Sequence, residues 1–309
     1  MKEKYVAVAG GSNVDIQGFS AEKMNFRDSN PGRIRLCPGG VGRNIAENLA
    51  RMGTAVKMIS VVGDDHFGRI ILRSCSDSGV DTADIEVLAD YSSSTYLVLT
   101  DQDGDMFTAV SDMHIIKEMG RDFIRRHART LEGAAAIVID PNLSADSLDE
   151  LTETYFSKPI FADPISITYA GVMKPFLSRL YMVKCNRYEA EVLSGNSIEK
   201  ESDLSSAAEK ILSTGLKNIV ITLGAEGSLY ADAFGRVIRC KPEEVVLSKS
   251  ATGAGDAFTA GMVYGMIHRM TPETSLSLAG RAAVMALSHE MTVNPNMTPA
   301  VLGLGENNL

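Results

Sequence analysis

Extended and helical segments alternate through the second half of this chain, and this alternation restricts the possible folds more than any other feature. From residue 115 onward, short apolar runs suited to buried strands are separated by segments of helical character, and the runs are Ala135 to Ile139, Pro159 to Ala162, Leu180 to Lys184 and Asn218 to Leu223. Such alternation is typical of βαβ units, whose parallel strands are covered by helices on both faces. The sequence therefore predicts a three-layer α/β/α fold with a mostly parallel central sheet.

The first third of the chain adds strands of a different kind. Tyr5 to Ala9 reads as a buried strand that ends at Gly10-Gly11, where a ligand site is expected to begin. Segments with little apolar content predict a small β-sheet lid, built from residues 14–38 and 92–112 and including a hairpin around Asp101 to Gly104. Further elements are expected at 42–52, 55–62, 67–78, 228–231, 237–240, 254–268 and 273–288. Without repeats or polar linkers, residues 1–309 are predicted to form one domain with a lid.

Composition limits the class of function. The chain of 309 residues has 45% hydrophobic content and a formal charge of −9, without basic runs, so we expect no nucleic-acid partner and a small-molecule substrate. No segment reaches the roughly 18 apolar residues of a membrane span, and no signal peptide is recognisable, so a cytoplasmic protein is expected. The cysteines show no paired spacing and are interpreted as reduced, packed thiols; they are Cys37, Cys75, Cys185 and Cys240.

The stretch Thr252-Gly253-Ala254-Gly255-Asp256 runs directly into an apolar helix. Two glycines allow several backbone N–H groups to point at one spot, and the helix dipole adds positive charge there. A carboxylate beside such an anion site suits a base that accepts a proton from an alcohol attacking phosphorus. We expect Asp256 to stay ionised near neutral pH. The alternative is an ordinary glycine turn with Asp256 as helix N-cap.

A second glycine-rich turn, Pro38-Gly39-Gly40-Val41-Gly42-Arg43-Asn44, leads into the helix at 42–52. It lacks the third glycine of a dinucleotide fingerprint, and the chain has no GxxxxGK[ST] motif, which excludes Rossmann and P-loop nucleotide sites. Asp15 and Asn44, beside bare backbone N–H groups, match the donors and acceptors of a ribose diol. A close contact between helix and sheet that needs small residues is the alternative.

Two further turns follow predicted strands. Asn186 and Glu189 lie three residues apart on a first helical turn, where Glu189 could organise Mg²⁺ through water, although a helix capping box explains the same pattern. Thr222 to Gly227 ends a strand with two glycines, where a nucleotide could lie against bare backbone. A simple hairpin turn is the alternative there.

Together these motifs, in this order and spacing, resemble the ribokinase-like (PfkB-type) carbohydrate kinases over nearly the whole chain. The resemblance implies an ATP-dependent kinase with Asp256 as catalytic base and Gly253, Ala254 and Gly255 as anion hole. It implies a sugar site formed by Asn13, Asp15, Gly40, Gly42 and Asn44. It implies ATP binding by Asn186, Thr222, Gly224, Glu226, Gly227 and Asn294, with Glu189 at Mg²⁺.

Within the family, Gly11 to Ile16, Asp28 to Gly32, Gly42 to Ala50 and Asn294-Pro295 resemble bacterial pseudouridine kinases, which implies phosphorylation of the 5′-hydroxyl of pseudouridine. Thr95, Asp112 and Asn142 are candidates to read the uracil edge. Many relatives carry Asp where this chain has Ser250, so dependence on a monovalent cation such as K⁺ is expected to be weak. Exposed lid edges predict a homodimer. The alternatives are a ribokinase, another sugar kinase, an ordinary nucleoside kinase of the same family, or a non-catalytic sugar-binding protein.

Overall fold

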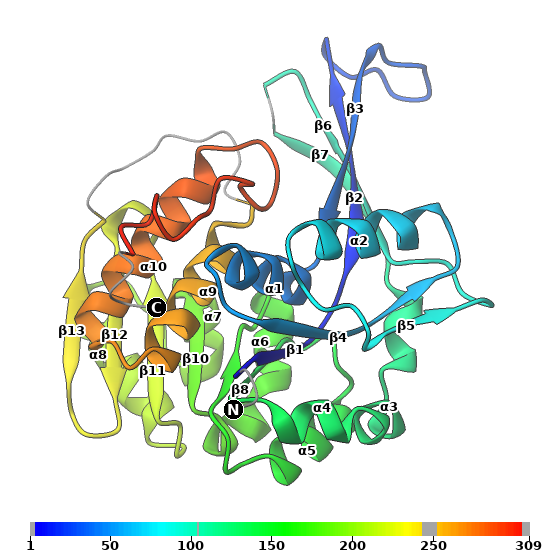
Figure 1. The fold of residues 1–309 in the computed structure, drawn as a ribbon. Coiled ribbons are helices and arrows are strands. Elements are labelled where there is room, and N and C mark those ends of the chain that lie inside the picture. The colour runs from blue at the N-terminus through cyan, green and yellow to red at the C-terminus, as the bar shows by residue number, and fades with distance from the viewer. Residues whose placement is uncertain (1–3, 104, 243–251, 305–309) are drawn as a thin grey trace.

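The central sheet of the molecule is built largely as the alternation of elements predicts (Figure 1). The computed structural model describes residues 4–103, 105–242 and 252–304. Within these ranges the sheet has nine strands in the order β13-β12-β11-β10-β9-β8-β1-β4-β5, and neighbours are parallel except in the β11–β12 and β12–β13 pairs. The strands are β1 (Val6–Ala9), β4 (Val56–Gly63), β5 (Ile85–Leu88), β8 (Ala136–Ile139), β9 (Ile160–Ala162), β10 (Met182–Asn186), β11 (Asn218–Thr222), β12 (Ser228–Asp232) and β13 (Val237–Cys240).

Helices cover both faces of this sheet, because successive side chains of a buried strand point to opposite sides. In β1, Val6 and Val8 pack in a core with α1 (Val41–Arg51), α2 (His66–Asp77), α9 (Ala254–Ile267) and α10 (Pro272–Leu287). Ala7 and Ala9 pack in a second core on the opposite face. That core includes side chains of η1 (His114–Glu118), α3 (Arg121–Arg126), α4 (Ala128–Gly133), α5 (Ala145–Thr154), α6 (Ile167–Met173), η2 (Lys174–Arg179), α7 (Arg187–Ser194) and α8 (Glu201–Leu212). The predicted α/β/α layering is confirmed.

The lid is a separate four-stranded sheet that extends away from the layered body (Figure 1). Its strand order is β3-β2-β6-β7, formed by β2 (Asn13–Ser20), β3 (Gly32–Gly39), β6 (Thr95–Thr100) and β7 (Met106–Asp112). The β2–β3 and β6–β7 pairs are antiparallel, and β2 pairs with β6 in parallel. Because β2 starts directly after the Gly11 turn and β3 ends at Gly39, both strands run without a linker into the predicted sugar-binding turns.

Most expected elements lie within about two residues of their predicted bounds. The helix α1 is followed by Gly53 with a φ of 87°, as the predicted glycine stop requires. Strand β5 is missing from the prediction, since only four residues, IEVL, form it, too few to show a clear alternation. Cys37, Cys75 and Cys185 are buried thiols, as expected of packed cysteines. In the described part of the chain, no helix is long and apolar enough to cross a bilayer.

Candidate active site

The turn before α9 combines backbone N–H groups with a buried carboxylate. Gly253 is the N-cap residue and has a left-handed backbone with a φ of 85°, which glycine adopts without steric cost. The N–H groups of the first helical turn have no partner within the helix, so they and the dipole favour an anion at this end. Asp256 is the third helical residue and is only 7% exposed. Because Gly253 occupies the N-cap position, the alternative of Asp256 as an ordinary N-cap is wrong.

Asp256 is held by α1, which lies beside α9. The side-chain Nδ2 of Asn44 donates a hydrogen bond of 2.6 Å to Oδ2 of Asp256. Burial raises the pKa of Asp256 to about 7, the carboxylate of Asp163 adds to this rise, and Lys184 and Asn44 oppose it. This rise opposes the expectation that Asp256 stays ionised near neutral pH, because the loss of hydration on burial works against the helix dipole. A carboxylate with this pKa is a stronger base than an exposed one.

The residues expected to bind the sugar lie where the lid joins the central sheet. Asn13 donates a hydrogen bond of 2.6 Å from Nδ2 to Oδ1 of Asp15, and both belong to β2. Burial raises the pKa of Asp15, although the bond from Asn13 opposes the rise. The Asp15 carboxylate packs against Gly39, so a methyl group on Gly39 would lie 2.7 Å from its oxygens. The lid thus brings an acceptor next to the turn that leads to Asn44.

Gly40 and Gly42 have a packing role in addition to their predicted role in sugar binding. Gly40 has a φ of 97° at the start of α1. A methyl group on Gly42 would lie 2.9 Å from the Cα of Gly10, so the contact between the two turns requires small residues. The packing alternative is therefore realised, and the same contact brings the predicted sugar-binding turns together.

Asp140, which the sequence analysis missed, fastens those two turns. It follows β8, is buried, and its Oδ2 accepts hydrogen bonds from the backbone N–H of Gly11 at 3.0 Å and of Gly42 at 2.9 Å. Burial raises the pKa of Asp140 to about 6, against the lowering effect of these N–H donors and of Asn142. Its position after a parallel strand, at the edge where ligands bind, is the signal that could have identified it.

The residues proposed to read a base edge are not all on one side of the lid. Asn142 donates from its backbone N–H to Asp140, and its side chain packs against Gly11, close to the predicted sugar site. Thr95 pairs with Val14 and with Asp112, so it lies on the lid face opposite to Asp15. Tyr96 pairs with Asp15 and shares its face. The register therefore places Tyr96, rather than Thr95 or Asp112, on the face that bears Asp15.

A cavity of about 660 Å³ lies at the carboxyl ends of β10 and β11 and reaches the start of α9. It is lined by predicted site residues, namely Asn186, Glu189, Thr222, Gly224, Gly227, Ala254, Gly255 and Asp256. Apolar residues of α10 form another part of the wall, including Leu276, Val284 and Leu287. A second cavity of about 610 Å³ lies at the amino ends of β9, β10 and β11, and none of the predicted site residues lines it. The first cavity is therefore the one that joins the predicted nucleotide and phosphoryl sites.

Two residues expected at ATP lie outside that lining. Glu226 is exposed and forms an ion pair of 3.1 Å with Arg187. Asn294 is buried, and its Nδ2 donates to the backbone oxygen of Met285 at 2.8 Å and to Oγ of Ser288 at 3.2 Å. The side-chain amide of Asn294 therefore joins the segment that follows α10 to the end of that helix.

Asn186 and Glu189 form the capping box that the sequence left open as an alternative. The Asn186 side chain accepts from the N–H of Glu189 at 2.9 Å, and the Glu189 carboxylate accepts from the N–H of Asn186 at 2.8 Å. Burial raises the pKa of Glu189, while its bonds to Asn186 and the nearby Lys184 lower it. A capping role does not exclude a ligand role, because Glu189 also lines the cavity.

A buried cation beside Asp256 also escaped the sequence analysis. Lys184, in the middle of β10, places its Nζ 3.0 Å from Oδ2 of Asp163, which also accepts a bond of 2.8 Å from Thr259. Although burial lowers the pKa of Lys184, the carboxylates of Asp163, Asp256 and Glu189 raise it, so the ammonium group stays charged. A methyl group on Gly255 would lie 2.8 Å from this Nζ. The charged side chain of Lys184 therefore lies next to the turn before α9.

The residues suited to a metal ion are few. Among the described residues, no group of three or more His, Cys, Asp or Glu side chains could hold a metal on its own. Mg²⁺ commonly keeps waters and takes further ligands from substrate phosphates, so a single carboxylate such as Glu189, lining the cavity, fits this ion. Ser250, on which the expectation of weak K⁺ dependence depends, lies outside the described residues.

Comparison with known proteins defines the class. Residues 3–299 match the pfkB family carbohydrate kinase. The chain is 35% identical to the pseudouridine kinase of Escherichia coli over 99% of its own length and 98% of that protein, and 30% identical to the guanosine-inosine kinase of Exiguobacterium acetylicum over 96% and 99%. The structure of Arabidopsis thaliana ribokinase complexed with ribose and ATP superposes with a TM-score of 0.86 at 19% identity, covering 98% of each chain.

This protein therefore belongs to the pfkB family of carbohydrate kinases and has the ribokinase-like fold. It is an ATP-dependent kinase. The resemblance inferred from the glycine-rich turns is confirmed, and its fold and enzyme class with it.

Proposed function

We propose that this enzyme transfers the γ-phosphoryl group of ATP to the 5′-hydroxyl of pseudouridine. The proposal depends on one observation: the buried pair of Asp256 and Asn44 lies at the amino end of α9, in a chain 35% identical to a pseudouridine kinase along almost its whole length. This pair supplies a base and an orienting amide at an anion site, which is what an alcohol acceptor requires.

The proposed chemistry assigns each bond change to a group of this chain. The 5′ oxygen attacks the γ-phosphorus, its proton passes to Asp256, and the bond from phosphorus to the β-phosphate oxygen breaks to release ADP. Backbone N–H groups of Gly253, Ala254 and Gly255 stabilise charge on the peripheral phosphoryl oxygens. Asn13, Asp15, Gly40, Gly42 and Asn44 hold the ribose, with Asp15 accepting from the diol. The 5′ oxygen is thereby directed at the turn before α9.

The nucleotide occupies the 660 Å³ cavity in this proposal. Asn186, Thr222, Gly224 and Gly227 line the side along β10 and β11, and the apolar residues of α10 suit a purine ring. The charged Nζ of Lys184 pairs with phosphate oxygens next to Gly255. Glu226 and Asn294 remain predicted ATP residues, although both lie outside the cavity lining. Mg²⁺, when bound, offsets charge on the phosphates, and Glu189 is the residue that would hold it through water.

The substrate assignment is tested by comparing kcat/KM for pseudouridine, uridine, inosine and ribose at equal concentration. Pseudouridine differs from uridine at the glycosidic bond and offers an additional ring N–H donor, and an unmet buried partner lowers the rate by about 10- to 100-fold. We therefore expect pseudouridine to be preferred by at least about tenfold. A preference for ribose or inosine would instead identify a ribokinase or ordinary nucleoside kinase of the same family. Phosphorylation of none of these compounds would contradict the proposal.

We also propose that two copies pair through the outer face of the lid. Leu36, Ile16, Leu97 and Val110 form a row across all four strands, on the face opposite to Asp15. Leu36, Leu97 and Val110 are 42%, 37% and 63% exposed, an apolar row that a second copy would cover. Strands β3 and β7 present unpaired edges beside it.

Sedimentation equilibrium tests this pairing. The protein is expected to sediment at twice its chain mass, and Val110→Asp is expected to shift it to the monomer, because a charge would be buried in the interface. Phe234→Asp serves as the matched control, since Phe234 is 96% exposed on the hairpin of the main sheet and should leave the dimer intact. A monomeric wild-type protein would contradict the proposal.

A further inference from the structure

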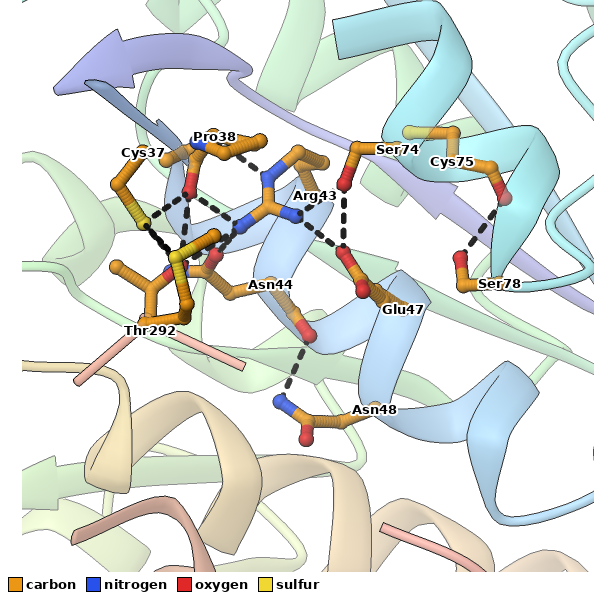
Figure 2. A network of polar contacts seen from close by, with 12 residues as sticks. Cys37, Pro38, Arg43, Asn44, Glu47, Asn48, Ser74, Cys75, Ser78 and Thr292 are labelled. Carbon is orange, nitrogen blue, oxygen red and sulfur yellow. Dashed lines mark hydrogen bonds and ion pairs between the residues drawn. The ribbon is translucent and has the colours of Figure 1, made fainter. Parts of the chain in front are cut away.

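Arg43 is the largest fully buried side chain of the described residues, and its surroundings are unusual for a helical arginine. It is 1% exposed in the first turn of α1. Its guanidinium donates from Nε to the backbone oxygen of Gly39 at 2.8 Å, and from Nη2 to the backbone oxygen of Pro38 at 2.8 Å and to Oγ1 of Thr292 at 3.0 Å. Figure 2 shows the guanidinium beside Pro38 and Thr292, which lie far apart in the chain. Burying this charge is favourable only with such partners.

One of its contacts acts directly on the proposed catalytic pair. Nη2 of Arg43 also donates to Oδ1 of Asn44, so the carbonyl side of that amide faces the arginine (Figure 2). The NH₂ side of Asn44 is consequently the one that donates to Oδ2 of Asp256. An asparagine amide has similar shape in both orientations, and only its hydrogen-bond partners decide between them. With the amide reversed, two oxygens would face each other beside Asp256 and the bond would be lost.

The guanidinium of Arg43 also connects the lid to the turn before α9. Pro38 and Gly39 end the lid strand β3, and Thr292 donates its own hydroxyl to the oxygen of Pro38 at 2.8 Å. The backbone oxygen of Thr292 packs directly on Gly253, so closely that a methyl group there would overlap it. Arg43 therefore touches the end of the lid, the segment covering Gly253, and the amide that orients Asp256.

A purely structural ion pair does not explain this arrangement. Glu47 pairs with Nη1 of Arg43, and its other oxygen pairs with Arg51 at 2.9 Å, so the acidic partner occupies one side of the guanidinium only. Nε and Nη2, on the other side, are directed at Gly39, Pro38, Asn44 and Thr292. That side is the one nearest the reaction.

We propose that Arg43 is a positioning residue that fixes the amide of Asn44 toward Asp256 and couples this orientation to the end of lid strand β3. The proposal rests on the proposed role of Asp256 as base. Arg43 itself does not touch the acceptor or the transferred group, and it acts through Asn44.

A double-mutant cycle tests this route of action. The variants are Arg43→Lys, Asn44→Ala and the double variant, assayed for kcat and KM with whichever acceptor of the panel the wild-type enzyme phosphorylates. Lysine keeps the charge but cannot donate to all these oxygens at once. We expect Arg43→Lys to lower kcat about tenfold when Asn44 is present and less than about twofold when Asn44 is alanine, as residues in one network are coupled. Equal losses in both backgrounds would overturn the proposal.

The pH profile supplies a second readout, which loss of stability alone does not move. The charged groups facing Asp256 are Asp163, Lys184 and Arg43, and Arg43→Lys keeps all three charges. Loss of the bond from Asn44 removes a contact that lowers the pKa of Asp256, so the acidic limb of kcat/KM is expected to move to higher pH. An unmoved limb with a lower melting temperature would show a structural role only and overturn the proposal.

Control variants separate this result from misfolding and from an incorrect substrate. Ser74→Ala is the matched control, because Ser74 donates to Glu47 at 3.1 Å and accepts only from Nη1 of Arg43, at 3.5 Å, on the side away from Asn44; it should leave kcat and the acidic limb unchanged. If Arg43→Lys does not fold, Thr292→Val replaces it in the cycle, because this variant removes one hydrogen-bond acceptor of Arg43. Thr292→Val is expected to lower kcat by less than Arg43→Lys does. This loss of kcat must also disappear in the Asn44→Ala background. Since any phosphorylated acceptor serves, a wrong substrate assignment would leave the cycle valid.

Discussion

Asp256→Asn is expected to lower kcat by about 10²- to 10⁴-fold, the range that a positioned base contributes. The amide keeps the shape of the carboxylate but cannot accept the proton of the acceptor alcohol. Affinity for ATP and for the acceptor should change little, because the backbone turn and Asn44 remain. Steady-state kinetics with titration calorimetry of each ligand would measure both quantities.

The same carboxylate should appear in the pH profile of the wild-type enzyme. A base must lose its proton before it acts, and burial raises the pKa of Asp256 to about 7, so kcat/KM should fall as the pH drops through about 7. The ordinary pKa of this carboxyl is 3.8 and that in the folded protein is about 7, so between these two pH values the folded protein binds one proton more than the unfolded chain. The free energy of unfolding therefore falls as the pH rises from 3.8 to about 7. Asp256→Asn has no carboxyl at this position and does not lose this stability, so its melting temperature at pH 8 should be no lower than that of the wild type.

Asp149→Asn is the control for this substitution. Asp149 lies on α5 and forms an ion pair of 2.7 Å with Arg179 on the surface, far along the chain from the motifs of the site. Its loss should leave kcat unchanged. An Asp256→Asn enzyme retaining more than about a tenth of wild-type kcat would contradict the assignment of a base, since even weak base catalysis contributes about 10²-fold.

Gly253→Ala is expected to lower kcat by at least about 10²-fold, comparable to the loss of one backbone donor to a transition state. The backbone φ of 85° is unfavourable for alanine, and the new methyl group would overlap the backbone oxygen of Thr292. The turn must therefore shift, and its N–H groups move away from the phosphoryl position. Initial-rate measurements under saturating ATP and acceptor would show the effect.

Gly171→Ala provides the comparison for that variant. Gly171 lies in α6, where an added methyl group meets no atom within 4 Å and the backbone has ordinary helical geometry, so its activity should equal that of wild type. If Gly253→Ala were as active as Gly171→Ala, the turn before α9 would have no part in stabilising the transferred group.

The sequence revealed the elements whose signals are local. The alternation after residue 115 predicts the parallel sheet, and glycines with positive φ, such as Gly53, mark where helices stop. The turns at Gly40 and Gly253 were found because their special backbone needs glycine. Strand β5 escaped because four residues carry too little pattern, and tertiary pairing with β4 decides its conformation.

The side chains that organise the site were harder to find. Asp140 contacts Gly11, 129 residues away in the chain, and Lys184 pairs with Asp163, which directly follows the neighbouring strand β9. Only the order of strands in the sheet brings such pairs together. The rise in the pKa of Asp256 could not be predicted from the sequence for the same reason, since its burial and the nearness of Asp163 arise from packing, whereas the helix dipole is visible from the motif alone.

The direct junction between lid and sugar turns has a consequence for attempts to transplant specificity. Strands β2 and β3 have no spacer at their bases: Asn13 and Asp15 belong to one, and the other ends at Gly39 beside Arg43. A chimera that exchanged whole lids between relatives would thus also replace the proposed ribose ligands and disturb the arginine network. Crossover points beyond Gln17 and before Arg35 would leave that machinery intact, and the distal half of the lid is the segment that recombination can vary independently.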